Sequence, residues 1–85
     1  SGGNEVFLKG DVTIGSYTVI GTMSMISCNV VIGNHCVVAA HSFVNKDVPD
    51  NSIVAGVPAR MIGKVVHMED GMVKFEYNNL EIRRD

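Results

Sequence analysis

Histidines, cysteines and a late group of basic residues are the side chains of this sequence that could do chemistry. The histidines are His35, His41 and His67. Histidine titrates near neutral pH, so it is the usual general base and a common metal ligand. His35 and His41 stand six positions apart with no evident third ligand, so we expect no metal site. Surface or interface roles are favoured for both, with a general-base role left open.

The two cysteines are too few for a disulfide framework. Cys36 is expected in the core, where free cysteine commonly lies. Cys28 falls in an outward phase with no base beside it in sequence, so a nucleophilic role is not expected. We expect cytoplasmic residence.

The charged residues argue against nucleic acid as a partner and leave phosphate groups as a candidate ligand. Seven Lys and Arg residues against nine Asp and Glu give a net charge of −2, without a basic stripe, so nucleic acid is not expected. No apolar run approaches the roughly twenty residues of a membrane span, and no signal-peptide pattern is present. Lys46, Arg60 and Lys64 all lie late in the repeat part of the chain, where they could meet phosphates or be ordinary surface charges.

An aliphatic residue recurs at every sixth position and must organise these side chains. It is followed four places later by a small or β-branched residue, and often directly by glycine or alanine. A fixed short period indicates a repeat architecture. The aliphatic positions are Leu8, Ile14, Ile20, Ile26, Ile32, Val38 and Val44.

A period of six fits neither a helix nor plain strand alternation. It suits a short strand followed by a corner, and three corners close a triangular coil. Successive coils would then stack about 4.8 Å apart, as parallel strands do. The outward Met23 and Met25, near His41 and Phe43, predict a packing surface against another subunit.

The repeat resembles that of the hexapeptide-repeat acyltransferases. Ile14-Gly15, Ile20-Gly21 and Ile32-Gly33 carry the likeness, and the segment from Ala55 to Arg60 is similar to the C-terminal part of galactoside, maltose and serine O-acetyltransferases. The resemblance implies an all-β, left-handed parallel β-helix and a homotrimer. We expect one domain over 1–85, with the β-helix at 6–64 and an excursion from it at 45–53.

The rest of the chain predicts a different local structure. Asp70-Gly71 lies between alternating runs, which is a hairpin signal. We therefore expect a C-terminal β-hairpin at 65–77 and a polar tail at 78–85.

The family likeness implies acetyl coenzyme A as co-substrate, with its arm along the coils and its phosphates near cations. Carried over to this sequence, it implies that the arm passes Gly21, Thr22, Ala39 and Ala40. Asn45 and Lys46 would lie near the nucleotide, with Arg60 and Lys64 close by. His41 departs from the pattern, since the family usually has glycine there.

Catalysis departs from the family pattern as well. The family's general-base histidine lies two places after the aliphatic residue, or in a segment that precedes this one. The matching positions here are Gly10, Ser16, Thr22, Cys28, Asn34, Ala40 and Lys46. We therefore assign no catalytic residue. The expected function is an acyltransferase acting on a small molecule or sugar, or its coenzyme-binding C-terminal part; the alternative is a non-catalytic trimeric module.

Overall fold

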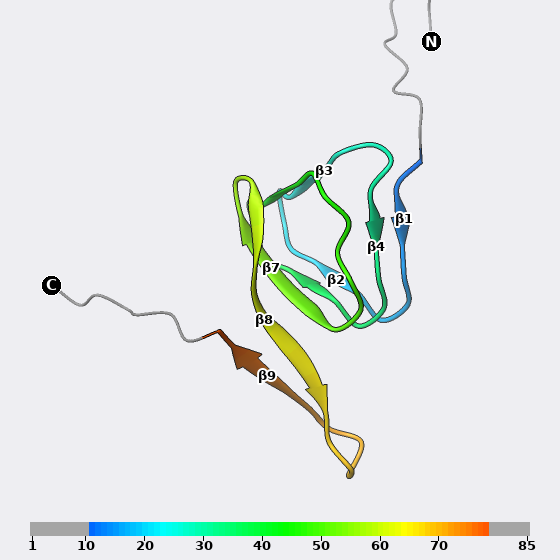
Figure 1. The fold of residues 1–85 in the computed structure, drawn as a ribbon, viewed down its shortest axis with the longest axis vertical. Helices are drawn as coiled ribbons and strands as arrows, with labels where there is room; N and C mark the ends of the chain where they lie inside the picture. Colours follow the sequence, from blue (N-terminus) through cyan, green and yellow to red (C-terminus); the bar gives the residue numbers. More distant parts are fainter. Residues whose placement is uncertain (1–10, 79–85) are drawn as a thin grey trace, which may run out of the picture.

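Each hexapeptide forms a two-residue strand and a corner in the computed structural model, which describes residues 11–78 (Figure 1). The aliphatic residue of the repeat ends every one of these strands. They are β1 Thr13–Ile14, β2 Val19–Ile20, β3 Met25–Ile26, β4 Val31–Ile32, β5 Val37–Val38 and β6 Phe43–Val44.

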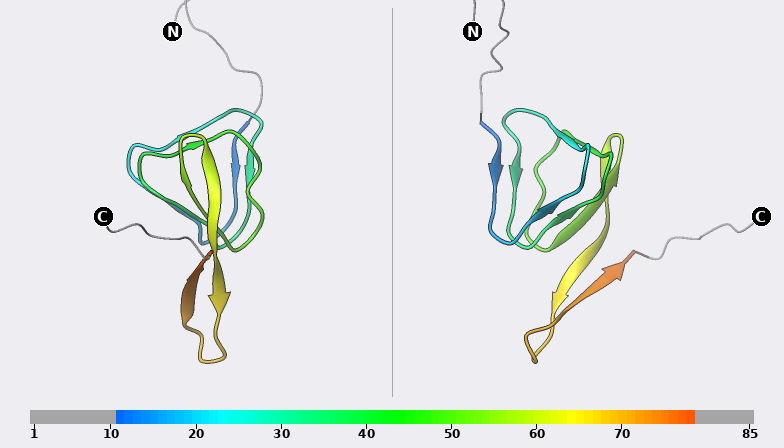
Figure 2. Two further views of the ribbon diagram at one scale, coloured as in Figure 1. Left: turned by 60° about the vertical axis from the view of Figure 1, so that its left-hand side comes forward. Right: turned by 180° about the vertical axis from the view of Figure 1, so that it is seen from behind.

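Strands eighteen residues apart stack in parallel and build three walls. β1 pairs with β4 to form wall A, β2 pairs with β5 in wall B, and β3 pairs with β6 in wall C. Figure 2 shows the stacked coils with their three-cornered outline. Ile20, Ile26 and Ile32 therefore lie on three different walls, as the period of six predicts.

Three longer strands extend wall B. β7 (Ser52–Gly56) is parallel to β5, β8 (Ala59–His67) is antiparallel to β7, and β9 (Val73–Tyr77) is antiparallel to β8. The predicted C-terminal β-hairpin is confirmed, with pairing from Gly63 and Tyr77 to His67 and Val73. It projects beyond the column (Figure 2).

Residues 45–53 were expected to leave the column. Val48 lies within this segment, but it is only 5% exposed and forms a parallel bridge with Ile32 of wall A. The prediction is therefore wrong at Val48. Val48 follows Ile32 by sixteen residues instead of eighteen, and β7 stacks on β5 with the same sixteen-residue spacing, so the coil is shortened by two residues at one corner.

The core lies inside the coils from Val30 onward, which we call the upper coils. Ile32, Val38 and Val44 are each 1% exposed, and Cys36 is fully buried, as predicted. Ile14, in the first coil that the structure describes, is 45% exposed. Burial of the same repeat position therefore rises along the column.

Hydroxyl groups in the small inward positions fasten one coil to the next. Thr18 Oγ1 donates to Gly33 O at 2.7 Å and accepts from Cys36 N at 3.2 Å. Ser24 Oγ repeats this pattern with Ala39 O at 2.8 Å and Ser42 N at 3.2 Å. Because buried polar backbone groups need partners, these side chains satisfy atoms that the corners would leave unpaired.

Six non-glycine residues in the left-handed backbone conformation lie at corners of the described part of the column. Their φ angles lie between 56° and 64°. Side chains at these positions point away from the column interior, because the aliphatic and small positions occupy it. The residues are Tyr17, Met23, Asn29, His35, His41 and Asn51.

Truncating two isoleucines at equivalent repeat positions should have unequal effects. Ile32→Ala is expected to lower the free energy of unfolding by about 3 kcal/mol, because the side chain is fully enclosed. Ile14→Ala should cost about 1 kcal/mol, since nearly half of that side chain already meets solvent. Urea unfolding followed by circular dichroism measures both. Equal losses would contradict the graded burial.

Candidate functional site

Four of the residues implied by the family likeness lie together where wall B turns into wall C. Gly21 and Thr22 follow β2, and Ala39 and Ala40 follow β5. Gly21 N donates to Val38 O at 2.7 Å, which places the two corners on adjacent coils. A β-carbon added to Gly21 would lie 2.7 Å from Ala40 Cα. We call Gly21, Thr22, Ala39 and Ala40 the small-residue corner.

Backbone is accessible at the small-residue corner because its side chains are short. Thr22 and Ala40 are exposed, and Gly21 and Ala39 are half-buried. His41 stands beside them with an exposed side chain, and its N donates to Thr22 O at 3.0 Å. A thin ligand could therefore approach the corner, with the His41 ring at its side.

Arg60 lies two strands beyond Ala39 in the order β5-β7-β8 of wall B. Ala39 N donates to Val54 O at 2.9 Å, so Ala55 stacks above Ala39. Arg60 is the strand partner of Ala55 across β7 and β8. The row of small residues therefore leads to a guanidinium group.

A cavity of about 240 Å³ joins Arg60 to Lys46 at the upper end of the column. Val44, Val54 and Met61 give it an apolar lining. Asp47 also lines it, but Asp47 Oδ1 accepts a hydrogen bond from Val31 N at 2.8 Å. Two cations and one carboxylate therefore border this hollow, and the excess of positive charge suits a phosphate.

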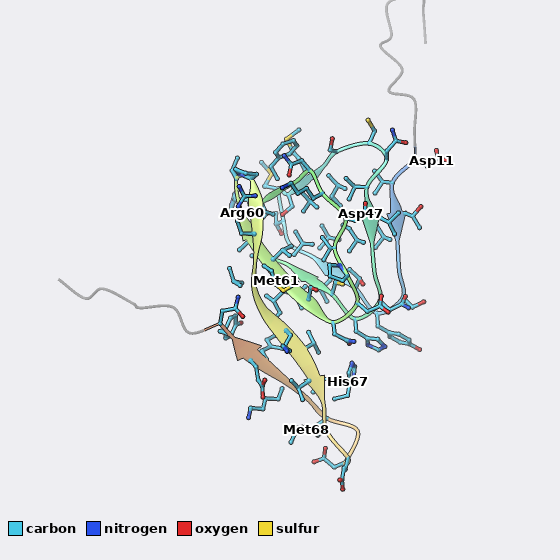
Figure 3. All side chains as sticks on the ribbon, viewed as in Figure 1. Asp11, Asp47, Arg60, Met61, His67 and Met68 are labelled. Carbon is cyan, nitrogen blue, oxygen red and sulfur yellow. The ribbon has the colours of Figure 1, made fainter. Side chains whose placement is uncertain are left out.

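The two remaining predicted binding residues lie elsewhere. Asn45 is exposed on the next corner, where Ser27 N donates to Val44 O at 2.8 Å. Lys64 is exposed on β8, with Ser52 and Glu76 as strand partners, and does not line the cavity of Lys46 and Arg60. Figure 3 shows Arg60 and His67 at opposite ends of β8.

His35 sits in a ring stack that the sequence reading missed. Its ring stacks on Tyr17 with centroids 5.3 Å apart and meets His67 edge to face at 4.6 Å. The eighteen-residue spacing of Tyr17 and His35 was a usable signal, because it places them on one corner of adjacent coils. The approach of His67 depends on the hairpin and had no such signal.

Asn34, at one of the repeat positions that would carry a catalytic histidine, has a structural role. Asn34 Oδ1 accepts from Ser16 N at 2.8 Å, and Asp50 Oδ1 accepts from Asn34 N at 2.8 Å. These bonds form a ladder along one corner. Among residues 11–78, no group of three or more His, Cys, Asp or Glu side chains is placed to hold a metal ion. No helix in this part of the chain could cross a membrane.

Comparisons with known proteins agree with the repeat. The family model described as bacterial transferase hexapeptide (six repeats) matches residues 11–46. Galactoside O-acetyltransferase of Escherichia coli (strain K12) is 43% identical over 54 residues, covering 64% of this chain and 27% of that protein. Serine acetyltransferase 4 of Arabidopsis thaliana is 44% identical over 59 residues, which cover 69% of this chain and 17% of that protein.

A solved structure gives the same result. A hexapeptide-repeat containing acetyltransferase from Vibrio cholerae O1 biovar eltor, complexed with acetyl coenzyme A, is 40% identical with a TM-score of 0.64. The match covers 65% of this chain and 30% of that one. The fold is thus a left-handed parallel β-helix. The chain spans about a quarter or less of the length of the two curated relatives.

Proposed function

We propose that the chain, which resembles the hexapeptide-repeat acyltransferases, is the coenzyme-binding C-terminal part of an acetyl coenzyme A dependent acyltransferase. The acceptor is a hydroxyl or amino group of a small molecule or sugar. Relatives named as galactoside and serine acetyltransferases support this acceptor class.

One observation carries the proposal. The small-residue corner leads, two strands beyond Ala39, to Arg60 and to the cavity that Arg60 shares with Lys46. The pantetheine arm would lie along the exposed backbone of that corner, and the two cations would offset phosphate charge. Asn45 and Lys64 are proposed as outer contacts of the nucleotide. Acetyl coenzyme A supplies the activated acetyl thioester, and this part of the protein binds and orients it.

We propose a homotrimer as the working assembly. Repeat coils bury their apolar faces only against neighbours, and this column is short. Its outer surface carries exposed apolar side chains: Met23 is 74% exposed and Met25 is 68% exposed. Met25 lies beside Phe43 on wall C, which supports the predicted packing surface. Cytoplasmic residence stays a prediction.

A non-catalytic trimeric module is the second candidate function. Repeat positions 16, 22, 28, 34, 40 and 46 lack histidine, so none of these described positions offers the family's usual base for the acceptor. Binding without turnover by this chain would fit either a scaffold or the coenzyme-binding part of a longer enzyme.

Calorimetric titration with coenzyme A tests the proposal. A saturable heat with a dissociation constant below about 1 mM, roughly −4 kcal/mol, is expected. Thioester consumption in the presence of sugars and amines then separates transferase from binding module. The absence of any heat at millimolar coenzyme A would contradict the proposed function for this chain.

A further inference from the structure

A second hollow lies at the opposite end of wall B from the small-residue corner. Its volume is about 370 Å³, within the range of small-molecule sites. The floor combines outward residues of the column with residues of the hairpin, so the hollow depends on the hairpin's projection from the column (Figure 2). The apolar lining residues are Val19, Val37, Val65, Val73 and Phe75.

Three rings form the polar wall of this hollow. Tyr17 and His35 stack with an interplanar angle of 14°, and His67 meets His35 at 83°. Figure 3 shows the His67 side chain reaching from β8 toward the column. The rings come from two coils and the hairpin, so the wall exists only in the folded chain.

The hydrogen bonds of His35 and His67 determine which of their ring nitrogens can bind a ligand. His67 Nε2 lies 2.7 Å from Asn51 Oδ1, which can only accept, so Nε2 donates and Nδ1 is left as the acceptor of the neutral ring. Within residues 11–78, the ring nitrogens of His35 make no hydrogen bond. The wall therefore offers acceptor nitrogens to a ligand that carries a donor.

The surrounding charges select against an anionic ligand. Neither lysine nor arginine lines the hollow in the described part of the chain. Glu69 and Asp70 border a neighbouring hollow that His67 also lines, and the Asp50 carboxylate lies on the same corner as His35. A carboxylate or phosphate would meet these acids with no cation to balance them.

We propose that this hollow binds a small uncharged aromatic alcohol of the phenol class. The ligand ring packs on the valines and Phe75, and its hydroxyl donates to an imidazole nitrogen of His35 or His67. The site is separate from the small-residue corner and does not depend on coenzyme binding. A ligand of this size is expected to bind with a dissociation constant of roughly 1 mM.

Phenol titration of the full chain, followed by the NMR signals of the histidine ring protons, tests the site. Saturable shifts of His35 and His67 are expected, with His41 unchanged. Anisole has the same ring without the hydroxyl proton and should bind at least about fivefold more weakly, as should benzoate. Linear, non-saturating shifts, or equal affinity for phenol and anisole, would overturn the proposal.

A matched pair of variants checks the location. His35 and His41 share the left-handed corner conformation, with φ of 56° and 59°, and asparagine accepts that conformation. His35→Asn should weaken phenol at least about fivefold, whereas His41→Asn should leave it unchanged. Phe75→Ser removes a half-exposed ring from the hollow and should also weaken binding. Equal behaviour of the two histidine variants, with a neutral Phe75→Ser, would exclude the site.

Discussion

Gly21→Ala is expected to destabilise the column by about 2 to 3 kcal/mol. The new β-carbon would be forced against the Ala40 backbone of the next coil, 2.7 Å from its Cα. Backbone cannot move aside as a flexible side chain can, so the two coils must separate. For a domain of this size, the melting temperature should fall by roughly 10 to 20 °C.

Ser27→Ala is the matched control for Gly21→Ala. Ser27 follows Ile26 as Gly21 follows Ile20, so it occupies the same repeat position, but its corner already holds a β-carbon. The change should alter the free energy of unfolding by no more than about 0.5 kcal/mol. Thermal and urea unfolding of both variants measure the two changes in stability. If both variants are as stable as the parent, close coil stacking does not explain the glycine.

Removing both cations of the upper cavity should selectively weaken coenzyme binding. Lys46→Gln with Arg60→Gln is expected to reduce the affinity for coenzyme A by roughly tenfold to a hundredfold, because each cation can make a charge-assisted hydrogen bond to phosphate. Calorimetry measures the loss. Pantetheine lacks the phosphates and should bind the parent and the double variant equally.

Lys74→Gln supplies a control for that experiment, because it removes one positive charge far from the cavity of Lys46 and Arg60. Lys74 lies on β9, 3.8 Å from Glu76, and is exposed. Its loss should leave coenzyme A affinity unchanged. An equal loss from Lys74→Gln would mean that the overall charge of the protein acts, and an unchanged affinity in the double variant would remove Lys46 and Arg60 from the phosphate site.

The sequence predicts the walls well because their cause is periodic. An aliphatic residue at every sixth position places Ile20, Ile26 and Ile32 on successive walls, and the structure confirms this. The hairpin is also found, because Asp70-Gly71 is a local turn signal. The shortened coil at Val48 is missed, since turn-forming residues in sequence do not reveal whether a segment leaves a wall or merely tightens it.

The candidate site is predicted less completely. Adjacent coils bring Gly21 and Ala40 together by simple arithmetic, so their contact follows from the repeat. Arg60 and Lys46 meet at one cavity only because β8 folds back over the upper coil, which no period encodes. The ring stack shows the same division: Tyr17 and His35 obey the repeat, whereas His67 arrives with the hairpin.

The left-handed corners have a consequence for how this surface can change. A residue with a β-carbon in that conformation carries a local penalty of roughly 1 to 2 kcal/mol, which asparagine and glycine largely avoid. Tyr17, Met23, His35 and His41 all carry it. Backbone preference alone would favour asparagine or glycine at each of these four positions. Their identities are therefore best understood through what their exposed side chains meet beyond their own coil, which makes the three edges of the column its most informative surface for finding partners.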